Sequence, residues 1–89
     1  MKAVILYKPN SETESSVQEY IRNFARETGR AIALVDSDSV QGIDIAAQYD
    51  ILRFPAIVVF EDDGTYVDSW VDRESWPTAA ELSYYNQQS

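Results

Sequence analysis

The stretch FPAIVVFEDDGTYVDSWV, residues 54–71, constrains the fold more than any other part of the sequence. It contains two runs rich in β-branched and aromatic residues, 56–60 and 65–71, which are separated by the turn residues Asp62, Asp63 and Gly64. An Asp-Gly turn between two such runs is a strong hairpin signal, because Asp and Gly tolerate the backbone angles of a tight reversal. We therefore expect two antiparallel strands that are neighbours in one sheet.

The first third of the chain predicts two parallel strands joined by a helix. Residues 2–8 form an apolar run flanked by lysines, which is typical of a strand buried on both faces. Residues 11–28 carry apolar side chains at three- and four-residue spacing, as an amphipathic helix does, and Gly29 is its expected end. The run 31–36 is the second strand, which such a helical crossover makes a parallel neighbour of the first.

The remaining elements are a weaker helix over 40–49 and a last helix. In the weaker helix, Gly42 lowers the helix propensity, and Asp50 is expected to end the helix in a left-handed conformation. Pro77 suits the first turn of the last helix, which should run to about residue 85 before a disordered polar tail over about 86–89. The inward-facing set predicted for the weaker helix is Val40, Ile43, Ala46 and Ala47.

Strand alternation also predicts which side chains of 65–71 face the core. Tyr66, Asp68 and Trp70 should share one face, with Val67 and Val71 on the core face. At 89 residues, without linkers or repeats, the chain is expected to form a single domain over 1–89.

Composition excludes several classes of function. The chain has no cysteine and no histidine, so it has neither the thiolate of redox and nucleophilic chemistry nor the commonest metal ligand and general base. Its acidic clusters lack the spacing of a calcium loop, so we expect no metal site and no cofactor. A net charge of −8 opposes nucleic acid and anionic membranes, and a charged partner should be basic. The start MKAVILYK is interpreted as a strand and not a signal peptide, which favours a cytoplasmic location.

The order β-α-β-α-β-β-α, together with YDILRFPAIVVFEDDG at 49–64, resembles the thioredoxin fold in its small, glutaredoxin-sized form. The resemblance covers roughly residues 2–86. It implies an α/β protein, a three-layer α/β/α sandwich around a mixed four-stranded sheet. It also implies a cis peptide bond between Phe54 and Pro55, whereas a trans proline opening a strand is the alternative.

By the same resemblance, the segment SETE, Ser11 to Glu14, stands where active relatives carry their two cysteines. A serine hydroxyl cannot form a disulfide, so the resemblance implies a redox-inactive domain. The segment also matches a capping box, in which the Ser11 side chain accepts from the Glu14 N–H and the Glu14 carboxylate accepts from the Ser11 N–H. Two alternatives stay open: Ser11 contacts a ligand, or it replaces a native cysteine.

The resemblance also implies candidate binding residues. In relatives, the residue before the cis proline offers its backbone to glutathione or to an extended peptide. The corresponding groove here is expected at Tyr7, Ser11, Glu14, Phe54 and Pro55.

Two further pairs of residues are candidates outside this groove. Glu74–Ser75 resembles the acidic-Ser pair by which glutathione transferases hold the γ-glutamyl end of glutathione. Trp70 and Trp76 are an expected protein interface, with filling of the core as the alternative.

These features favour a domain that is not an enzyme and that binds a protein partner as a monomer or weak homodimer. The alternative is a glutathione-binding relic, or an oxidoreductase of the thioredoxin or glutaredoxin type whose cysteines were lost or replaced by serine.

Overall fold

The structure, a computed structural model, describes residues 2–86 and follows the expected order of elements. The tail predicted for about 86–89 lies outside the described residues, apart from Asn86, which ends the last helix. The elements are β1 (Lys2–Tyr7), α1 (Glu14–Thr28), β2 (Ala33–Asp36), α2 (Val40–Gln48), β3 (Ala56–Phe60), β4 (Tyr66–Trp70), the 3₁₀ turn η1 (Arg73–Ser75) and α3 (Ala79–Asn86).

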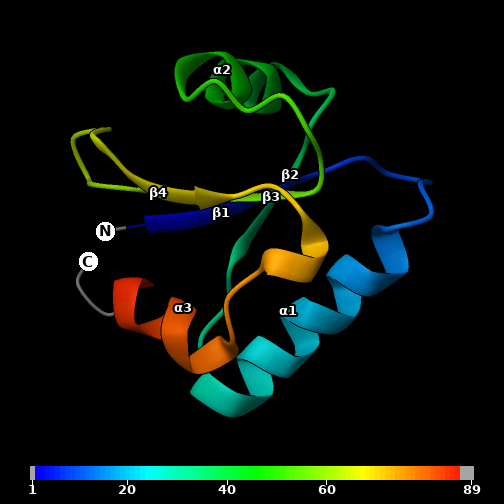
Figure 1. Ribbon diagram of the computed structural model, residues 1–89, viewed down its shortest axis with the longest axis vertical. Helices are drawn as coiled ribbons and strands as arrows, with labels where there is room; N and C mark the ends of the chain where they lie inside the picture. Colours follow the sequence, from blue (N-terminus) through cyan, green and yellow to red (C-terminus); the bar gives the residue numbers. More distant parts are fainter. Residues whose placement is uncertain (1, 87–89) are drawn as a thin grey trace.

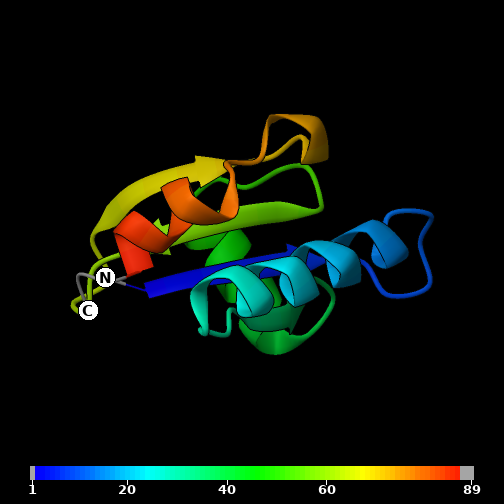
Figure 2. The ribbon, with the colours of Figure 1, turned by 90° about the horizontal axis from the view of Figure 1, so that it is seen from below.

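The four strands form one mixed sheet in the order β2-β1-β3-β4. β1 pairs with β2 in parallel and with β3 in antiparallel fashion, and β4 pairs antiparallel with β3, as the hairpin signal predicted. Figure 1 shows the sheet edge-on, with α2 alone above it and α1 and α3 below. Figure 2 shows α1 and α3 lying side by side over the same face. The fold is therefore the expected three-layer α/β/α sandwich.

The central strands β1 and β3 supply both halves of the core, because alternate side chains point to opposite faces. Ile5, Ile57 and Val59 pack with α1 and α3, whereas Val4, Leu6 and Val58 pack on the face covered by α2. This burial on both faces explains why the two strands consist almost wholly of apolar residues.

The inward face predicted for α2 was right at Ala46 and wrong at its other three positions. Val40 and Ile43 are 80% and 56% exposed, Ala47 is exposed too, and Ile45 and Tyr49 pack on the core beside Ala46. The cause is Gly42, which is buried against the backbone before the helix; a Cβ there would lie 2.1 Å from the carbonyl oxygen of Asp36. The residue that weakened the sequence prediction thus determines how α2 lies on the sheet.

A β-bulge overturns the alternation predicted for β4. Val59 pairs with Asp68 and Phe60 with Tyr66, which leaves Val67 as an extra residue on the β4 side. Tyr66 consequently lies on the α2 face beside Tyr49, whereas Trp70 packs on the face covered by α1 and α3.

The two valines expected on one core face are separated by the same bulge. Val67 packs on the face of α1 and α3, and Val71 packs on the face of α2. Pairs of residues two apart along a strand share a face only where the pairing is regular.

The ends of the helices follow local chemistry. Gly29 and Asp50 are both left-handed, with φ of 72° and 55°. This conformation was predicted for Asp50, and Gly29 ends α1 as expected. The last helix begins with a capping box that the sequence analysis missed: the Glu81 N–H donates to Thr78 Oγ1 at 3.2 Å, and the Thr78 N–H donates to Glu81 Oε1 at 3.1 Å. Pro77 precedes this box, and the helix starts at Ala79.

Candidate functional site

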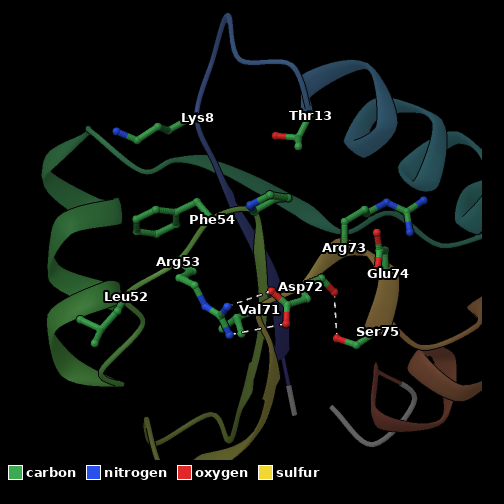
Figure 3. A pocket seen from close by; sticks show the side chains of 11 residues that line it. Lys8, Thr13, Leu52, Arg53, Phe54, Val71, Asp72, Arg73, Glu74 and Ser75 are labelled. Atoms are coloured by element: carbon green, nitrogen blue, oxygen red, sulfur yellow. Dashed lines mark hydrogen bonds and ion pairs between the residues drawn. The ribbon is translucent and has the colours of Figure 1, made fainter.

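A groove of about 670 Å³ lies beside the Phe54–Pro55 peptide bond, which is cis in the structure. Three segments that are distant in sequence meet there: the connection from β1 to α1, the loop before β3, and the chain after β4 (Figure 3). We call this the cis-proline groove. Its lining residues are Lys8, Thr13, Leu52, Arg53, Phe54, Pro55, Val71, Asp72, Arg73, Glu74 and Ser75.

One wall of the cis-proline groove is apolar and open to solvent. Leu52 is 87% exposed, and Phe54 is half-buried beside the buried Pro55. Among the described residues, neither the N–H nor the C=O of Phe54 makes a hydrogen bond to another backbone group. The wall therefore combines exposed apolar surface with a free backbone donor and acceptor.

The charged part of the groove is organised around Asp72. Its carboxylate is paired with the Arg53 guanidinium at 3.3 Å, and its carbonyl oxygen accepts from Ser75 Oγ at 2.8 Å (Figure 3). Both partners of the ion pair are exposed, so the pair contributes at most about 1 kcal/mol. Its effect is to link the loop before β3 to the segment after β4 across the groove.

The groove is not acidic, although the chain is. Lys8, Arg53 and Arg73 line it together with Asp72 and Glu74, so three of the seven basic residues of the chain are found here. Lys8 also lies 4.0 Å from the Asp38 carboxylate, at an exposed position.

Arg73 joins the groove to the core below it. Its side chain turns toward α1 in Figure 3, and its guanidinium carbon lies 5.0 Å from the ring centroids of both Tyr20 and Trp76. The Tyr20 hydroxyl donates to the carbonyl of Pro77 at 2.9 Å. Burial raises the pKa of Tyr20 to about 12; the Arg73 charge opposes this rise and the Glu81 charge adds to it.

The two tryptophans lie outside the groove lining. Trp76 is only 8% exposed and packs edge-to-face on Tyr20, with ring centroids 5.0 Å apart, so the expectation of an exposed interface residue is corrected: it fills the core. Trp70 is half-buried and packs edge-to-face on Tyr85 at 5.6 Å. A small domain needs its large aromatic side chains for core volume, and Trp76 serves this purpose.

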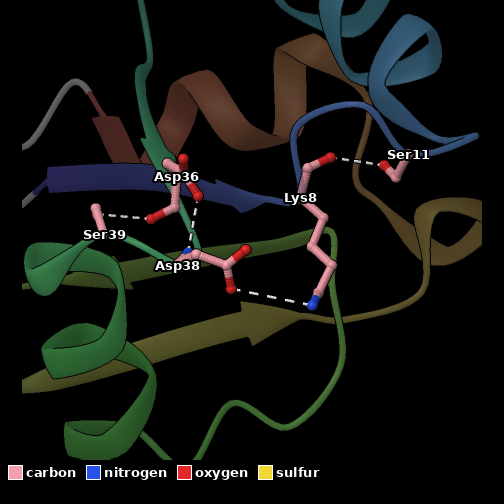
Figure 4. Close-up of polar contacts among 5 residues, drawn as sticks. All are labelled: Lys8, Ser11, Asp36, Asp38 and Ser39. Atoms are coloured by element: carbon pink, nitrogen blue, oxygen red, sulfur yellow. Dashed lines mark hydrogen bonds and ion pairs between the residues drawn. The ribbon is translucent and has the colours of Figure 1, made fainter.

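The capping box predicted for SETE is also wrong in its geometry. The helix begins at Glu14, and Ser11 Oγ donates to the Lys8 carbonyl at 2.6 Å instead of accepting from Glu14 (Figure 4). The Glu14 carboxylate accepts from the N–H of Asn10 at 3.1 Å, one residue earlier than expected. The reason is the left-handed Asn10, with φ of 63°, which inserts a turn before the helix. Ser11 closes this turn by its bond to Lys8.

The structure brings four of the candidate residues into one groove and places the others elsewhere. Phe54, Pro55, Glu74 and Ser75 line it together. Tyr7 packs against the core at the end of β1, and Ser11 and Glu14 are engaged in the turn before α1. The lining residues that the sequence analysis did not single out are Lys8, Thr13, Leu52, Arg53, Val71, Asp72 and Arg73. No spacing signal marks them, because they come from three loops.

Residues 2–86 contain no cluster of three or more acidic side chains placed to hold a metal ion. No helix within the same range is long and apolar enough to span a bilayer.

Comparison with solved structures identifies the architecture. Thioredoxin 1 of the thermophilic eubacterium Thermosipho africanus TCF52B superposes with a TM-score of 0.62 at 11% identity, over 99% of this chain and 92% of its own. Fasciola hepatica thioredoxin superposes with a TM-score of 0.64 at 22% identity, over 97% of this chain and 77% of its own. The chain has the thioredoxin fold. It has this fold without a single cysteine, as the sequence analysis inferred.

Comparison by sequence adds no relative. No protein-family profile matches the chain, and none of the curated proteins matches it either. The likeness to thioredoxins therefore lies in the arrangement of the elements in space.

Proposed function

We propose that this thioredoxin fold binds an extended segment of a protein partner in the cis-proline groove, and that it acts by binding and not by catalysis. The observation that carries the proposal is the wall formed by Leu52 and Phe54. An almost fully exposed leucine stands beside a half-buried phenylalanine whose backbone N–H and C=O are unpaired. Without thiols the chain has no route to disulfide exchange, so binding is the activity its chemistry retains.

The mode of binding follows from the groups available. An extended segment can donate to and accept from the backbone of Phe54, as a strand does when it adds to a sheet. Alternate side chains of that segment would then point toward the apolar groups Leu52 and Val71. Backbone pairing supplies affinity, and the apolar wall selects the sequence of the segment.

The charge of the domain indicates which partners it should attract. The net charge of −8 attracts basic partners at long range, whereas the groove itself is nearly balanced. We therefore expect a partner that is basic overall and that presents a mainly apolar extended segment to the groove. Its rate of association should fall as salt is added, because salt screens the long-range attraction.

Glutathione is the alternative ligand, and one observation favours it. Glu74 and Ser75 line the same groove as Phe54, so an acidic-Ser pair and a strand-like backbone are both within reach of one small peptide. Against glutathione, the hydroxyl of Ser75 is already engaged, because Ser75 Oγ donates to the Asp72 carbonyl. We therefore rank glutathione second to a protein segment.

The test begins with selection of binders from a random peptide display library on the immobilised protein. Dissociation constants of the selected peptides are then measured by fluorescence anisotropy for the wild type, for Leu52→Ser and for Ile43→Ser. Leu52→Ser should weaken binding by roughly tenfold or more, since it removes a leucine that binding would bury. Ile43→Ser is the matched control, because Ile43 is exposed on α2 and does not line the groove. Equal affinities for wild type and Leu52→Ser would refute the proposal.

A second titration separates the two ligands. Reduced glutathione is added to the ¹⁵N-labelled protein while amide shifts are recorded. We expect no saturable shifts at millimolar glutathione. Saturable shifts confined to Phe54, Glu74 and Ser75 would instead assign the groove to glutathione.

A further inference from the structure

The two faces of the sheet are covered unequally. α1, with 15 residues, and α3, with 8, cover one face, whereas α2, with 9, lies alone on the other (Figure 1). Beside α2 the second face exposes an aromatic stack. Tyr49 lies 5.4 Å from Phe60 in a stacked arrangement and 6.1 Å from Tyr66, which is 49% exposed. One short helix thus leaves apolar surface of this face open to solvent.

A second groove, of about 630 Å³, follows α2 along this open surface. Its floor consists of the partly buried Ile45, Tyr49 and Phe60, and its rim includes Val40 and Asp44. Val40, like Ile43, is an exposed apolar residue of α2 that was expected in the core. We call this the α2 groove; it shares no lining residue with the cis-proline groove.

The position of the α2 groove favours a helix over an extended segment as its ligand. The groove reaches the sheet at Phe60 of β3, which is already paired with Lys2 of β1 on one side and with Tyr66 of β4 on the other. An extended segment would find no free sheet edge here to satisfy its N–H and C=O groups. A helix satisfies its own backbone, so it suits this site. From Val40 to Gln48 the groove extends about 12 Å, which corresponds to roughly two helical turns.

Charge selects the chemistry of the occupant. Asp44 lines the groove, and Glu61, Asp62 and Asp63 lie in the β3–β4 turn, whose Gly64 lines it as well. This turn meets α2 where the Tyr49 hydroxyl donates to the Gly64 carbonyl at 2.6 Å. Lys2 is the one basic lining residue.

We propose that the α2 groove docks an amphipathic helix of a protein partner, whose apolar side chains enter the groove and whose flanking Lys and Arg residues face Asp44 and Glu61. Burial of the apolar stripe supplies affinity, and the acidic surroundings select basic helices over acidic ones. This surface is separate from the cis-proline groove, so the two proposals stand or fall independently.

The test uses two synthetic amphipathic helical peptides of about two to three turns. Both carry the same leucine stripe, but one has lysines and the other glutamates at the flanking positions. Each is titrated into the ¹⁵N-labelled protein. The lysine peptide should shift amide resonances of α2 and Gly64 saturably, and the glutamate peptide should not. Added salt should weaken binding of the lysine peptide.

Matched variants test whether Asp44, Glu61 and Val40 contact the peptide. The double variant Asp44→Lys/Glu61→Lys should lower the affinity for the lysine peptide by about fivefold to tenfold. The control is Glu19→Lys/Glu27→Lys, which makes an equal charge change at exposed positions of α1 and should change the affinity much less. Val40→Ser should weaken binding more than Ile43→Ser, because only Val40 lines the groove.

Four results would overturn this proposal. The first is equal binding of both peptides, and the second is equal weakening by the two charge-reversed pairs. The third is a shift map centred on Phe54 instead of α2, which would assign peptide binding to the cis-proline groove. The fourth is a set of α2 shifts that depend on protein concentration without peptide, which would assign this surface to self-association.

Discussion

Replacement of Gly42 by alanine tests how α2 is positioned on the sheet. Alanine is ordinarily the better helix former, by about 1 kcal/mol. Here its Cβ would lie 2.1 Å from the Asp36 carbonyl oxygen, so helix and loop must separate by about 1.3 Å to reach ordinary contact. The carbonyl cannot easily move away, because it accepts from both the N–H and the Oγ of Ser39 at 3.0 and 2.7 Å (Figure 4).

The two effects oppose each other, and the clash should win. Overpacking costs about 1–3 kcal/mol, and contact with a hydrogen-bonded backbone group belongs at the upper end of that range. After the gain in helix propensity is subtracted, the free energy of unfolding should fall by about 2 kcal/mol. For a chain of this length, that corresponds to a melting temperature lower by about 8–16 °C.

Urea denaturation followed by circular dichroism measures the change. Gln41→Ala is the control, since Gln41 is exposed on the same helical turn and its replacement should be nearly neutral. A Gly42→Ala protein as stable as the wild type, or more stable, would refute the claim that this close contact determines how α2 lies on the sheet.

Three further predictions follow from the core and the helix ends. Tyr20→Phe should remove part of the pH dependence of stability at alkaline pH. The pKa of Tyr20 is raised to about 12 in the folded state, so the contribution of Tyr20 to stability is complete below pH 10 and is lost as the pH rises toward 12. Melting curves of the wild type and the variant over this pH range would show the difference. Thr78→Ala should lower the free energy of unfolding by about 1 kcal/mol in urea titrations, because it breaks the capping box of α3; no loss would contradict that assignment. Trp76→Ala should lower the free energy of unfolding by about 3–5 kcal/mol, and a loss below 1 kcal/mol would show that Trp76 is not a core residue.

The sequence predicted the fold well because its strongest signals are local. The hairpin turn, the left-handed Gly29 and Asp50, and the apolar run of β1 each depend on a few adjacent residues. The faces of α2 and β4 could not be predicted in the same way. One depends on a contact between Gly42 and the Asp36 carbonyl, and the other on a bulge at Val67. Periodicity assumes regular pairing and regular packing, and both positions depart from it.

The candidate site was predictable only where a motif marked it. Phe54 and Pro55 stood out by resemblance, whereas Leu52 and Arg53 are adjacent in sequence but carry no pattern of their own. Asp72 and Arg73 reach the groove through the fold alone, since the chain after β4 returns over the loop before β3. In the turn before α1 a motif was present but misleading. S-x-x-E matched a capping box from Ser11 to Glu14, but Asn10 is left-handed and its N–H takes the Glu14 carboxylate instead.

The most direct test of the proposed function is the hydrogen exchange of the Phe54 amide. Its exchange rate is measured by NMR in the free protein and in complex with a peptide selected on it. If a partner segment pairs with the backbone of Phe54, this amide should exchange markedly more slowly in the complex, while exposed amides of α1 keep their rates. An unchanged rate for Phe54 in a saturated complex would contradict the account of the cis-proline groove.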